Sequence, residues 1–193
     1  ERTVKAVGRV GADADGAFVK DVLARHGVDV SAVAARAEET TSFTDVMSVR
    51  GGERTFFSYA GACADFGLGD VDFDALGCGR LHLGYFLLLA KIDAGDGVKI
   101  LAAARERGIR TSIDLVSEAG DRYRLVRDAL PFVDDLVVNE LEAGRLVGIE
   151  PERGNLRTIA EALRKLGVKG RVIIHQPELG VVLGPDGFTV RDS

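Results

Sequence analysis

Asn139 and Glu142 are the polar pair in this sequence whose types and spacing most clearly suggest chemistry. They follow a short apolar run, Leu136–Val138, and stand at the start of a helical pattern. Polar groups at the junction of a buried strand and a helix N-terminus are where open α/β sheets bind phosphates and metal ions. Residues three apart share a helix face, so both side chains can converge on one hydrated cation.

Both residues also have ordinary structural explanations. Asn139 can serve as the N-cap of the following helix, because its side-chain oxygen can accept a backbone N–H of the first turn. Glu142 in that first turn is stabilised by the helix dipole without any ligand. The residue types and their spacing leave these alternatives open.

Three further residues are candidates for a site or for local structure. Asp114 lies near the end of a predicted strand, Arg110–Val116, where it either joins a site or caps the turn at Ser117. Asp13 precedes a helical pattern and is expected to be its N-cap. His82 lies in an apolar strand pattern and is expected to be a hydrogen-bonded core histidine.

Strand patterns alternate with helix patterns along the chain, which indicates βαβ units and a mainly parallel sheet. Right-handed connections between such strands place helices on both faces, so we predict a three-layer α/β/α sandwich. We expect a single domain over residues 1–193. The predicted strands are Val4–Val10, Leu81–Leu88, Arg110–Val116, Leu136–Val138 and Val172–His175, and the predicted helices include Val98–Arg107, Arg122–Leu130, Glu140–Val147 and Leu156–Leu166.

Residues 38–62 break this alternation and predict a β lid. Two β-rich runs flank Arg50–Glu53, which has the composition of a hairpin turn. The segment carries four aromatic residues, Phe43, Phe56, Phe57 and Tyr59. An isolated hairpin is only marginally stable, so these rings are expected to pack on the main domain, on a substrate or on another subunit.

The composition describes a globular protein with an acidic balance. The chain has 193 residues, 46% of them hydrophobic, and a formal net charge of −5. This charge argues against nucleic acid or an anionic membrane as the main partner. The longest apolar runs are far shorter than the roughly 20 residues of a membrane span. Two cysteines without metal or disulfide spacing favour a reducing, cytoplasmic location.

Five segments, in this order, resemble motifs of the ribokinase-like (PfkB-type) family of sugar and nucleoside kinases. The Asn139–Glu142 segment is similar to the family's N-x-x-E motif, and Val7–Gly16 is similar to its G-x-V-G-x-D-x-x-G stretch. The other three are GVDVSAV from Gly27, the hairpin with the following GACADF segment, and SIDLVSE from Ser112, which stands at the place of a D-x-N-x-R type loop.

The resemblance implies an ATP- and Mg²⁺-dependent kinase that phosphorylates a hydroxymethyl group of a sugar and works as a homodimer through the lid. It implies that Asn139 and Glu142 act at the nucleotide and the metal, and that His175 lines the adenine or ribose site. It places Asp13 behind the substrate pocket and Asp114 in the substrate site. Arg54 either anchors a substrate hydroxyl from the lid or is an ordinary exposed hairpin arginine.

Two elements of the family have no counterpart in these 193 residues. One is the N-terminal strand with its substrate-binding aspartate, and the other is the D-T-x-G-A-G-D segment with the general base and the anion hole. We therefore expect an incomplete kinase that does not transfer phosphoryl groups as it stands. A nucleoside kinase of the same family, or a non-catalytic ligand-binding or regulatory α/β protein, are the alternatives.

Overall fold

The computed structural model describes residues 3–52, 54–118 and 120–192. The chain divides into two compact units, residues 1–76 and 77–193. The single domain expected from the sequence stays a prediction. Among the residues that the structure describes, no helix is long and apolar enough to cross a membrane.

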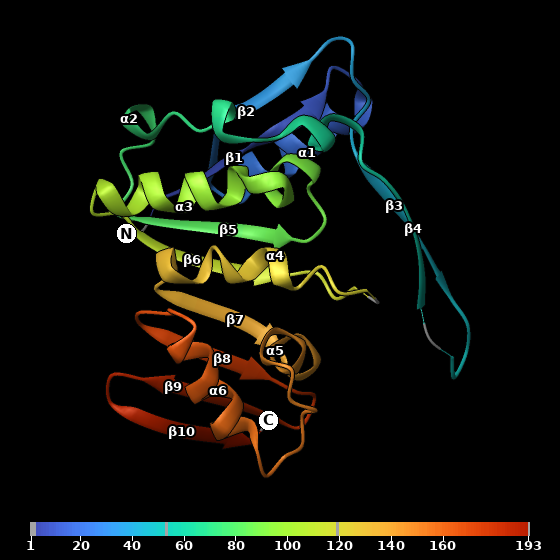
Figure 1. Ribbon diagram of the computed structural model, residues 1–193. Helices are drawn as coiled ribbons and strands as arrows, with labels where there is room; N and C mark the ends of the chain where they lie inside the picture. The colour runs from blue at the N-terminus through green and yellow to red at the C-terminus, as the bar shows by residue number, and fades with distance from the viewer. Residues whose placement is uncertain (1–2, 53, 119, 193) are drawn as a thin grey trace. The chain divides into compact units, whose positions relative to one another are not determined.

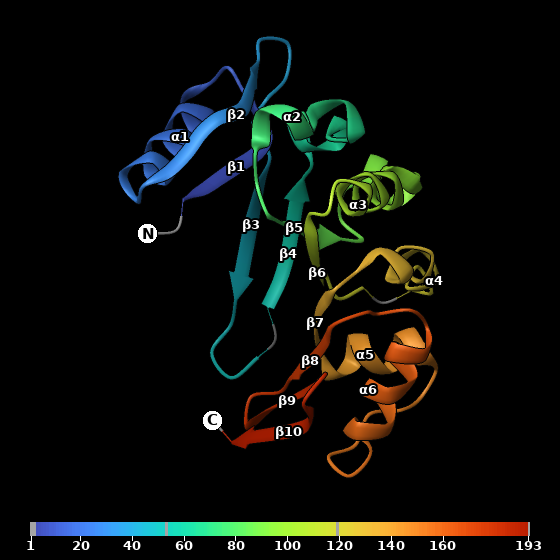
Figure 2. The ribbon, with the colours of Figure 1, turned by 90° about the vertical axis from the view of Figure 1, so that its left-hand side faces the viewer.

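The first unit is built around one parallel strand pair with a crossover helix. Strand β1 pairs with β2, and α1 connects the two and packs along them (Figure 2). The elements are β1 (Val4–Gly11), α1 (Ala14–Arg25), β2 (Val28–Arg36), β3 (Phe43–Ser48), β4 (Arg54–Tyr59) and α2 (Phe73–Leu76), with 3₁₀ turns η1 (Gly61–Asp65) and η2 (Leu68–Asp70).

The predicted lid hairpin is present as an antiparallel pair, β3 and β4, which Figure 1 shows as a long ribbon. Phe43 pairs with Tyr59, and Ser48 pairs with Arg54. Of the predicted turn, Glu53 lies outside the described residues. Because side chains alternate across a strand, this register places Phe43, Met47, Phe57 and Tyr59 on one face, and Val46 and Phe56 on the other.

The second unit is a six-stranded sheet with the order β10-β9-β8-β7-β6-β5 (Figure 1). Strands β5 to β8 are parallel, whereas β9 and β10 run antiparallel to their neighbours. This arrangement confirms the predicted α/β class with a mainly parallel sheet. The strands are β5 (Arg80–Phe86), β6 (Arg110–Leu115), β7 (Asp135–Asn139), β8 (Arg171–His175), β9 (Leu179–Gly184) and β10 (Gly187–Asp192).

The helices of this unit lie on one face of its sheet, as Figure 2 shows, so this unit by itself has two layers and not the three predicted for the whole chain. They are α3 (Gly97–Glu106), α4 (Arg124–Arg127), α5 (Glu140–Val147) and α6 (Leu156–Lys165), with short turns η3 (Ile92–Asp96) and η4 (Leu130–Phe132). The core between them is apolar and fully buried, and it includes Ile100, Leu101, Ile113, Leu136, Leu146, Ile159, Leu163, Val172 and Ile174. Burial of this surface is the main stabilising contribution to the unit.

A buried carboxylate aligns three strands at their amino-terminal ends. Asp135 of β7 accepts hydrogen bonds from Arg110 of β6 and from Arg171 of β8, at 3.0–3.2 Å. Burial of the Asp135 carboxyl raises its pKa, but the hydrogen bonds from the two arginines outweigh burial, so the pKa lies below its usual value. Asp135 therefore fixes the strands whose opposite ends carry the candidate site.

Candidate functional site at the carboxyl ends of the strands

Four of the residues predicted from the sequence lie near the ends of β6, β7 and β8; they are Asp114, Asn139, Glu142 and His175. Asn139 is the last residue of β7, and it lies opposite His175, the last residue of β8. Helix α5 begins directly after Asn139, at the arrowhead end of β7 in Figure 1. Because parallel strands end at the same edge of a sheet, their terminal side chains share one surface region.

Asn139 and Glu142 form a reciprocal capping box at the start of α5. The Asn139 Oδ1 accepts the Glu142 backbone N–H at 2.8 Å, and the Glu142 Oε2 accepts the Asn139 backbone N–H at 3.0 Å. The capping prediction for Asn139 is therefore confirmed. The Glu142 carboxylate is not a solvated first-turn group, because this residue is only 4% exposed.

Ser117 closes this pair into a ring of hydrogen bonds. Its hydroxyl donates to Glu142 Oε1 at 2.7 Å and accepts from Asn139 Nδ2 at 2.9 Å. Ser117 comes from the loop after β6, so the ends of the neighbouring strands β6 and β7 both contribute to this hydrogen-bonded set of side chains. From the sequence, Ser117 was expected only as part of a turn, and its contact with Asn139 and Glu142 was not predicted. Its place in the SIDLVSE segment, at the end of a predicted strand, was the available signal.

Asp114 of β6 holds two groups from β5. Its Oδ1 accepts the backbone N–H of Tyr85 at 2.6 Å, and its Oδ2 lies 3.2 Å from His82 Nε2. The Nδ1 of His82 lies 2.9 Å from the Ser112 hydroxyl. In the described contacts the partly exposed Asp114 carboxylate does not cap the Ser117 turn; it joins β5 to β6.

The prediction that His82 is a core histidine is wrong, although the prediction that it is hydrogen-bonded is confirmed. Its side chain is 51% exposed, because it points away from the face of β5 that buries Leu83. The hydrogen bond to Asp114 raises the pKa of His82, and the same bond lowers the pKa of Asp114. The hydrogen bond therefore favours the charged forms of both side chains, an imidazolium and a carboxylate.

His175 is exposed at the end of β8. The turn that follows is closed by a hydrogen bond from the Gln176 backbone N–H to the Leu179 carbonyl oxygen at 2.8 Å. The register places His175 beside Asn139, at the same edge of the sheet. Its role toward adenine or ribose stays a prediction.

In the first unit, Asp13 is the N-cap of α1, as the sequence predicted. Its Oδ1 accepts from the Gly16 backbone N–H at 2.8 Å and from the Thr41 hydroxyl at 2.6 Å, while Oδ2 accepts the Thr41 backbone N–H. The hydrogen bonds from Thr41 lower the pKa of Asp13. A Cβ at Gly11 would lie 2.6 Å from Asp13 Oδ2, so only glycine permits this close approach.

Arg54 is the first residue of β4 and is exposed. Its guanidinium lies 5.7 Å from the centroid of the Phe56 ring, which is within the range of a cation–π contact. Asp13 and Arg54 both belong to the first unit, whereas Asp114, Asn139, Glu142 and His175 belong to the second. Within the second unit, Asn139 and Glu142 are in direct contact through the capping box.

The donor atoms of Asn139 and Glu142 fit Mg²⁺ held through water. Carboxylate and amide oxygens are hard ligands, and Mg²⁺ usually keeps several waters in protein sites. Glu142 is buried and each of its oxygens already accepts one hydrogen bond, which favours contact through water over direct coordination. Among the described residues, no group of three or more His, Cys, Asp or Glu side chains is arranged to hold a metal ion.

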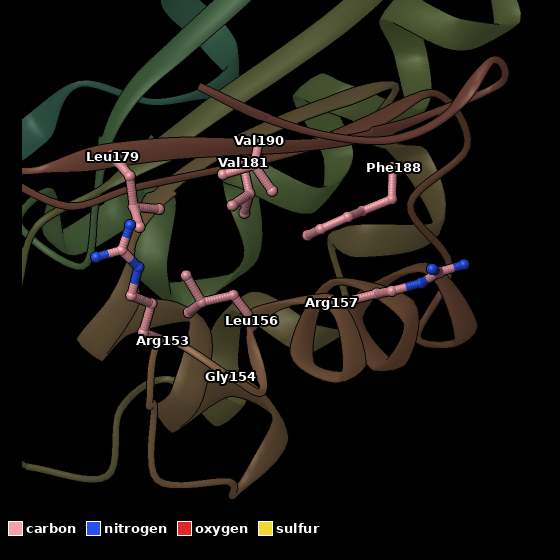
Figure 3. Close-up of a pocket in the computed structure, with 8 residues that line it drawn as sticks. All are labelled: Arg153, Gly154, Leu156, Arg157, Leu179, Val181, Phe188 and Val190. Carbon is pink, nitrogen blue, oxygen red and sulfur yellow. The ribbon is translucent and has the colours of Figure 1, made fainter. Parts of the chain in front are cut away.

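A cavity of about 190 Å³ lies between the start of α6 and the β9–β10 hairpin (Figure 3). Its floor is apolar, and the side chains of Arg153 and Arg157 lie at its margins. The lining residues are Arg153, Gly154, Leu156, Arg157, Leu179, Val181, Phe188 and Val190. None of the residues predicted from the sequence is among them, so this cavity is distinct from the polar groups at the strand ends.

A mainly parallel sheet with polar groups at the carboxyl ends of its strands is the architecture of ligand-binding open α/β proteins. Residues 2–191 match the pfkB family of carbohydrate kinases. The chain belongs to this family, which confirms the resemblance carried by its five motifs.

Solved structures of similar proteins agree with this fold. The chain is similar to a PfkB protein from Polaromonas sp. JS666, with a TM-score of 0.83 and 21% identity over 99% of this chain and 67% of that one. An E. coli protein provisionally called ribokinase II, in complex with ATP and Mg²⁺, matches with a TM-score of 0.80 and 20% identity over 99% and 62%. An adenosine kinase from Anopheles gambiae matches with a TM-score of 0.77 and 20% identity over 97% and 58%.

The TM-scores show a common fold, and at these identities the similarity shows the fold alone. The chain spans about three fifths to two thirds of the length of these relatives. The activity, substrate and partners of the whole protein are therefore proposals.

Proposed function

We propose that the whole protein transfers a phosphoryl group from ATP to a hydroxymethyl group of a sugar, with Mg²⁺ as cofactor. The observation that carries this proposal is the closed hydrogen-bonded group of Ser117, Asn139 and Glu142 at the strand ends of a pfkB-family chain. Such a group supports phosphoryl transfer because that reaction depends on positioning and charge stabilisation and needs few reactive side chains.

Each candidate residue has a defined part in this proposal. Asn139 and Glu142 orient water around Mg²⁺, which neutralises charge on the phosphates when it is bound. Asp114 accepts a hydrogen bond from a sugar hydroxyl through a lone pair that His82 and Tyr85 do not use. His175 contacts the nucleotide from the neighbouring strand end.

In the first unit, Asp13 supports the substrate region and Arg54 reaches a sugar hydroxyl from the lid. The Asp13 carboxylate accepts three hydrogen bonds from described residues, so we assign it a supporting role rather than direct substrate contact. Arg54 is exposed on β4 and offers a cation with several hydrogen-bond donors.

The lid hairpin supports the proposal of a homodimer. Phe43, Met47, Phe57 and Tyr59 share one face of the hairpin, and each is at least half exposed. An exposed apolar face on a two-stranded ribbon is an aggregation hazard unless a partner covers it. A second copy of the same hairpin can cover it symmetrically. We place the protein in the cytoplasm, where ATP is available and its two free cysteines stay reduced.

A nucleoside is the second candidate substrate, favoured by the fold similarity to an adenosine kinase. A phosphoryl-transfer screen distinguishes a sugar substrate from a nucleoside substrate. The full-length protein is incubated with ATP and Mg²⁺ and with ribose, fructose or adenosine, and ADP formation is followed. Transfer to a sugar supports the proposal, and transfer to adenosine alone supports a nucleoside kinase. The absence of transfer to all three would favour a non-catalytic binding protein.

A further inference from the structure

Two non-glycine residues, one near the end of β5 and one directly after it, have a left-handed backbone conformation. Tyr85 has a φ of 62° and Leu87 has a φ of 77°. This conformation is unfavourable for residues with a Cβ atom, and glycine adopts it without that cost. Two such residues within three positions require local contacts that hold the backbone in place.

Carboxylates supply those contacts. The Tyr85 N–H donates to Asp114 Oδ1 at 2.6 Å, and the Leu87 N–H donates to Asp93 Oδ1 at 2.8 Å. The Leu87 carbonyl oxygen accepts from Arg122 Nη1 at 3.1 Å, and Arg122 also pairs with Asp93. Strained backbone that is fixed by several independent contacts is typical of ligand-binding positions.

The segment from Tyr85 to Leu87 buries two side chains and exposes the third. Phe86 and Leu87 are almost fully buried, whereas Tyr85 is 60% exposed. Packing explains the apolar residues at 86 and 87, but it does not explain a large aromatic ring at an exposed position where glycine would relieve the strain. Tyr85 follows Gly84 at the carboxyl end of β5, and its backbone is bonded directly to Asp114.

We propose that Tyr85 is a specificity-determining residue whose ring stacks on the carbon face of the sugar substrate. This inference rests on the proposed kinase function and names the side chain that selects the acceptor. A sugar presents an apolar C–H face and a rim of hydroxyls, so it needs an aromatic surface next to a hydrogen-bond acceptor. The bond from the Tyr85 backbone N–H to Asp114 places the residue that carries this exposed ring next to the acceptor, and His82 holds Asp114 in place.

The test compares Tyr85→Gly with Tyr85→Phe in the full-length protein. Tyr85→Gly removes the ring and also relieves the left-handed strain, so its melting temperature is expected to equal or exceed that of the wild type. With ATP and Mg²⁺, the KM of Tyr85→Gly for the better of the two sugars, ribose or fructose, should rise about tenfold. The KM for ATP should stay unchanged. Tyr85→Phe keeps the ring and should keep the wild-type KM.

A matched control removes an exposed ring that has no strained backbone. Phe18 in α1 is 66% exposed, and Phe18→Ala should leave the KM values of both substrates unchanged. An unchanged sugar KM in Tyr85→Gly, with or without a lower melting temperature, would overturn the inference while wild-type turnover still supports the kinase function. An effect confined to adenosine would overturn the assignment to a sugar. Absence of wild-type transfer to all three acceptors would overturn both proposals.

Discussion

The hydroxyl of Ser117 donates a 2.7 Å hydrogen bond to Oε1 of Glu142, and this bond joins the loop after β6 to the first turn of α5. The two residues are 25 positions apart in the sequence. Because the same hydroxyl accepts from Asn139, it orients both members of the N-x-x-E motif. The geometry of the proposed metal site therefore depends on a residue outside the motif.

Glu142→Gln in the full-length protein should lower turnover and raise the Mg²⁺ concentration needed for half-maximal rate. An amide is neutral and a weaker partner for the waters around Mg²⁺ than a carboxylate. Because Glu142 is buried and accepts two hydrogen bonds, we also expect a stability loss of about 1 kcal/mol. Rate measurements over a Mg²⁺ series and urea denaturation check the two effects. An unchanged Mg²⁺ requirement would leave only the capping role.

Ser117→Ala should produce a smaller change in the same direction. It leaves Glu142 Oε1 and Asn139 Nδ2 without the hydroxyl that joins them, at a cost of about 1 kcal/mol in stability. Ser117→Thr keeps the hydroxyl and should restore the wild-type Mg²⁺ dependence. Equal Mg²⁺ dependence in the alanine variant and the wild type would show that Ser117 serves stability alone.

Asp135→Asn should destabilise the protein by about 1–3 kcal/mol at neutral pH, since it weakens charge-assisted bonds to two half-exposed arginines. The folded-state pKa of Asp135 is lowered, so this stabilisation is present above the unfolded-state pKa of about 3.9. It is lost as the pH falls through the folded-state pKa.

Urea denaturation at pH 7 and in steps below pH 4 should therefore show the wild type and Asp135→Asn converging in acid. Asp121→Asn is the control, because its pair with Arg124 is 3.9 Å long and largely exposed. A constant difference in the free energy of unfolding between Asp135→Asn and the wild type across this pH range would show that the ionised Asp135 carboxylate does not stabilise the fold.

The imidazole of His82 should titrate above the ordinary histidine pKa of about 6.5, because the imidazolium is bonded to Asp114. NMR chemical shifts of the ring protons measure this directly. Asp114→Asn should return the pKa toward the ordinary value, whereas Ser112→Ala should leave it raised. Because the folded-state pKa is raised, the stabilisation is complete below the unfolded-state pKa and is lost as the pH rises through the folded-state value. Both side chains are partly exposed, so this contribution is at most about 1 kcal/mol.

Phe57→Ser should shift the proposed dimer toward monomer more strongly than Phe56→Ser. Phe57 shares a face with Phe43, Met47 and Tyr59, whereas Phe56 lies on the opposite face with Val46 and polar neighbours. Analytical ultracentrifugation of the full-length protein at micromolar concentration measures the effect. Equal effects of the two substitutions would show that the apolar face defined by the register is not the contact surface. A monomeric wild type would contradict dimerisation through the lid.

Local patterns in the sequence predicted many of the elements and the capping at two helix starts. Apolar runs alternating with helical periodicity identified β1, β5, β6, β7 and β8, whereas β2, β9 and β10 were not predicted. Asn139 and Asp13 were identifiable because N-capping depends on residues within one turn of the helix. The hairpin was predicted from its turn composition between two β-rich runs, whereas its register came from the structure.

Contacts between distant segments were decided only by the tertiary structure. His82 stands in an apolar run that reads as core, yet the sheet turns its side chain outward toward Asp114, 32 residues away. The left-handed backbone of Tyr85 has no signal in its own residue type, because the carboxylate that holds it comes from the neighbouring strand. The sequence by itself determined many of the strand and helix segments and where polar residues follow them, because these depend on local composition and periodicity. The tertiary structure decided which of those polar residues meet, because strand order and register bring distant positions within hydrogen-bonding distance.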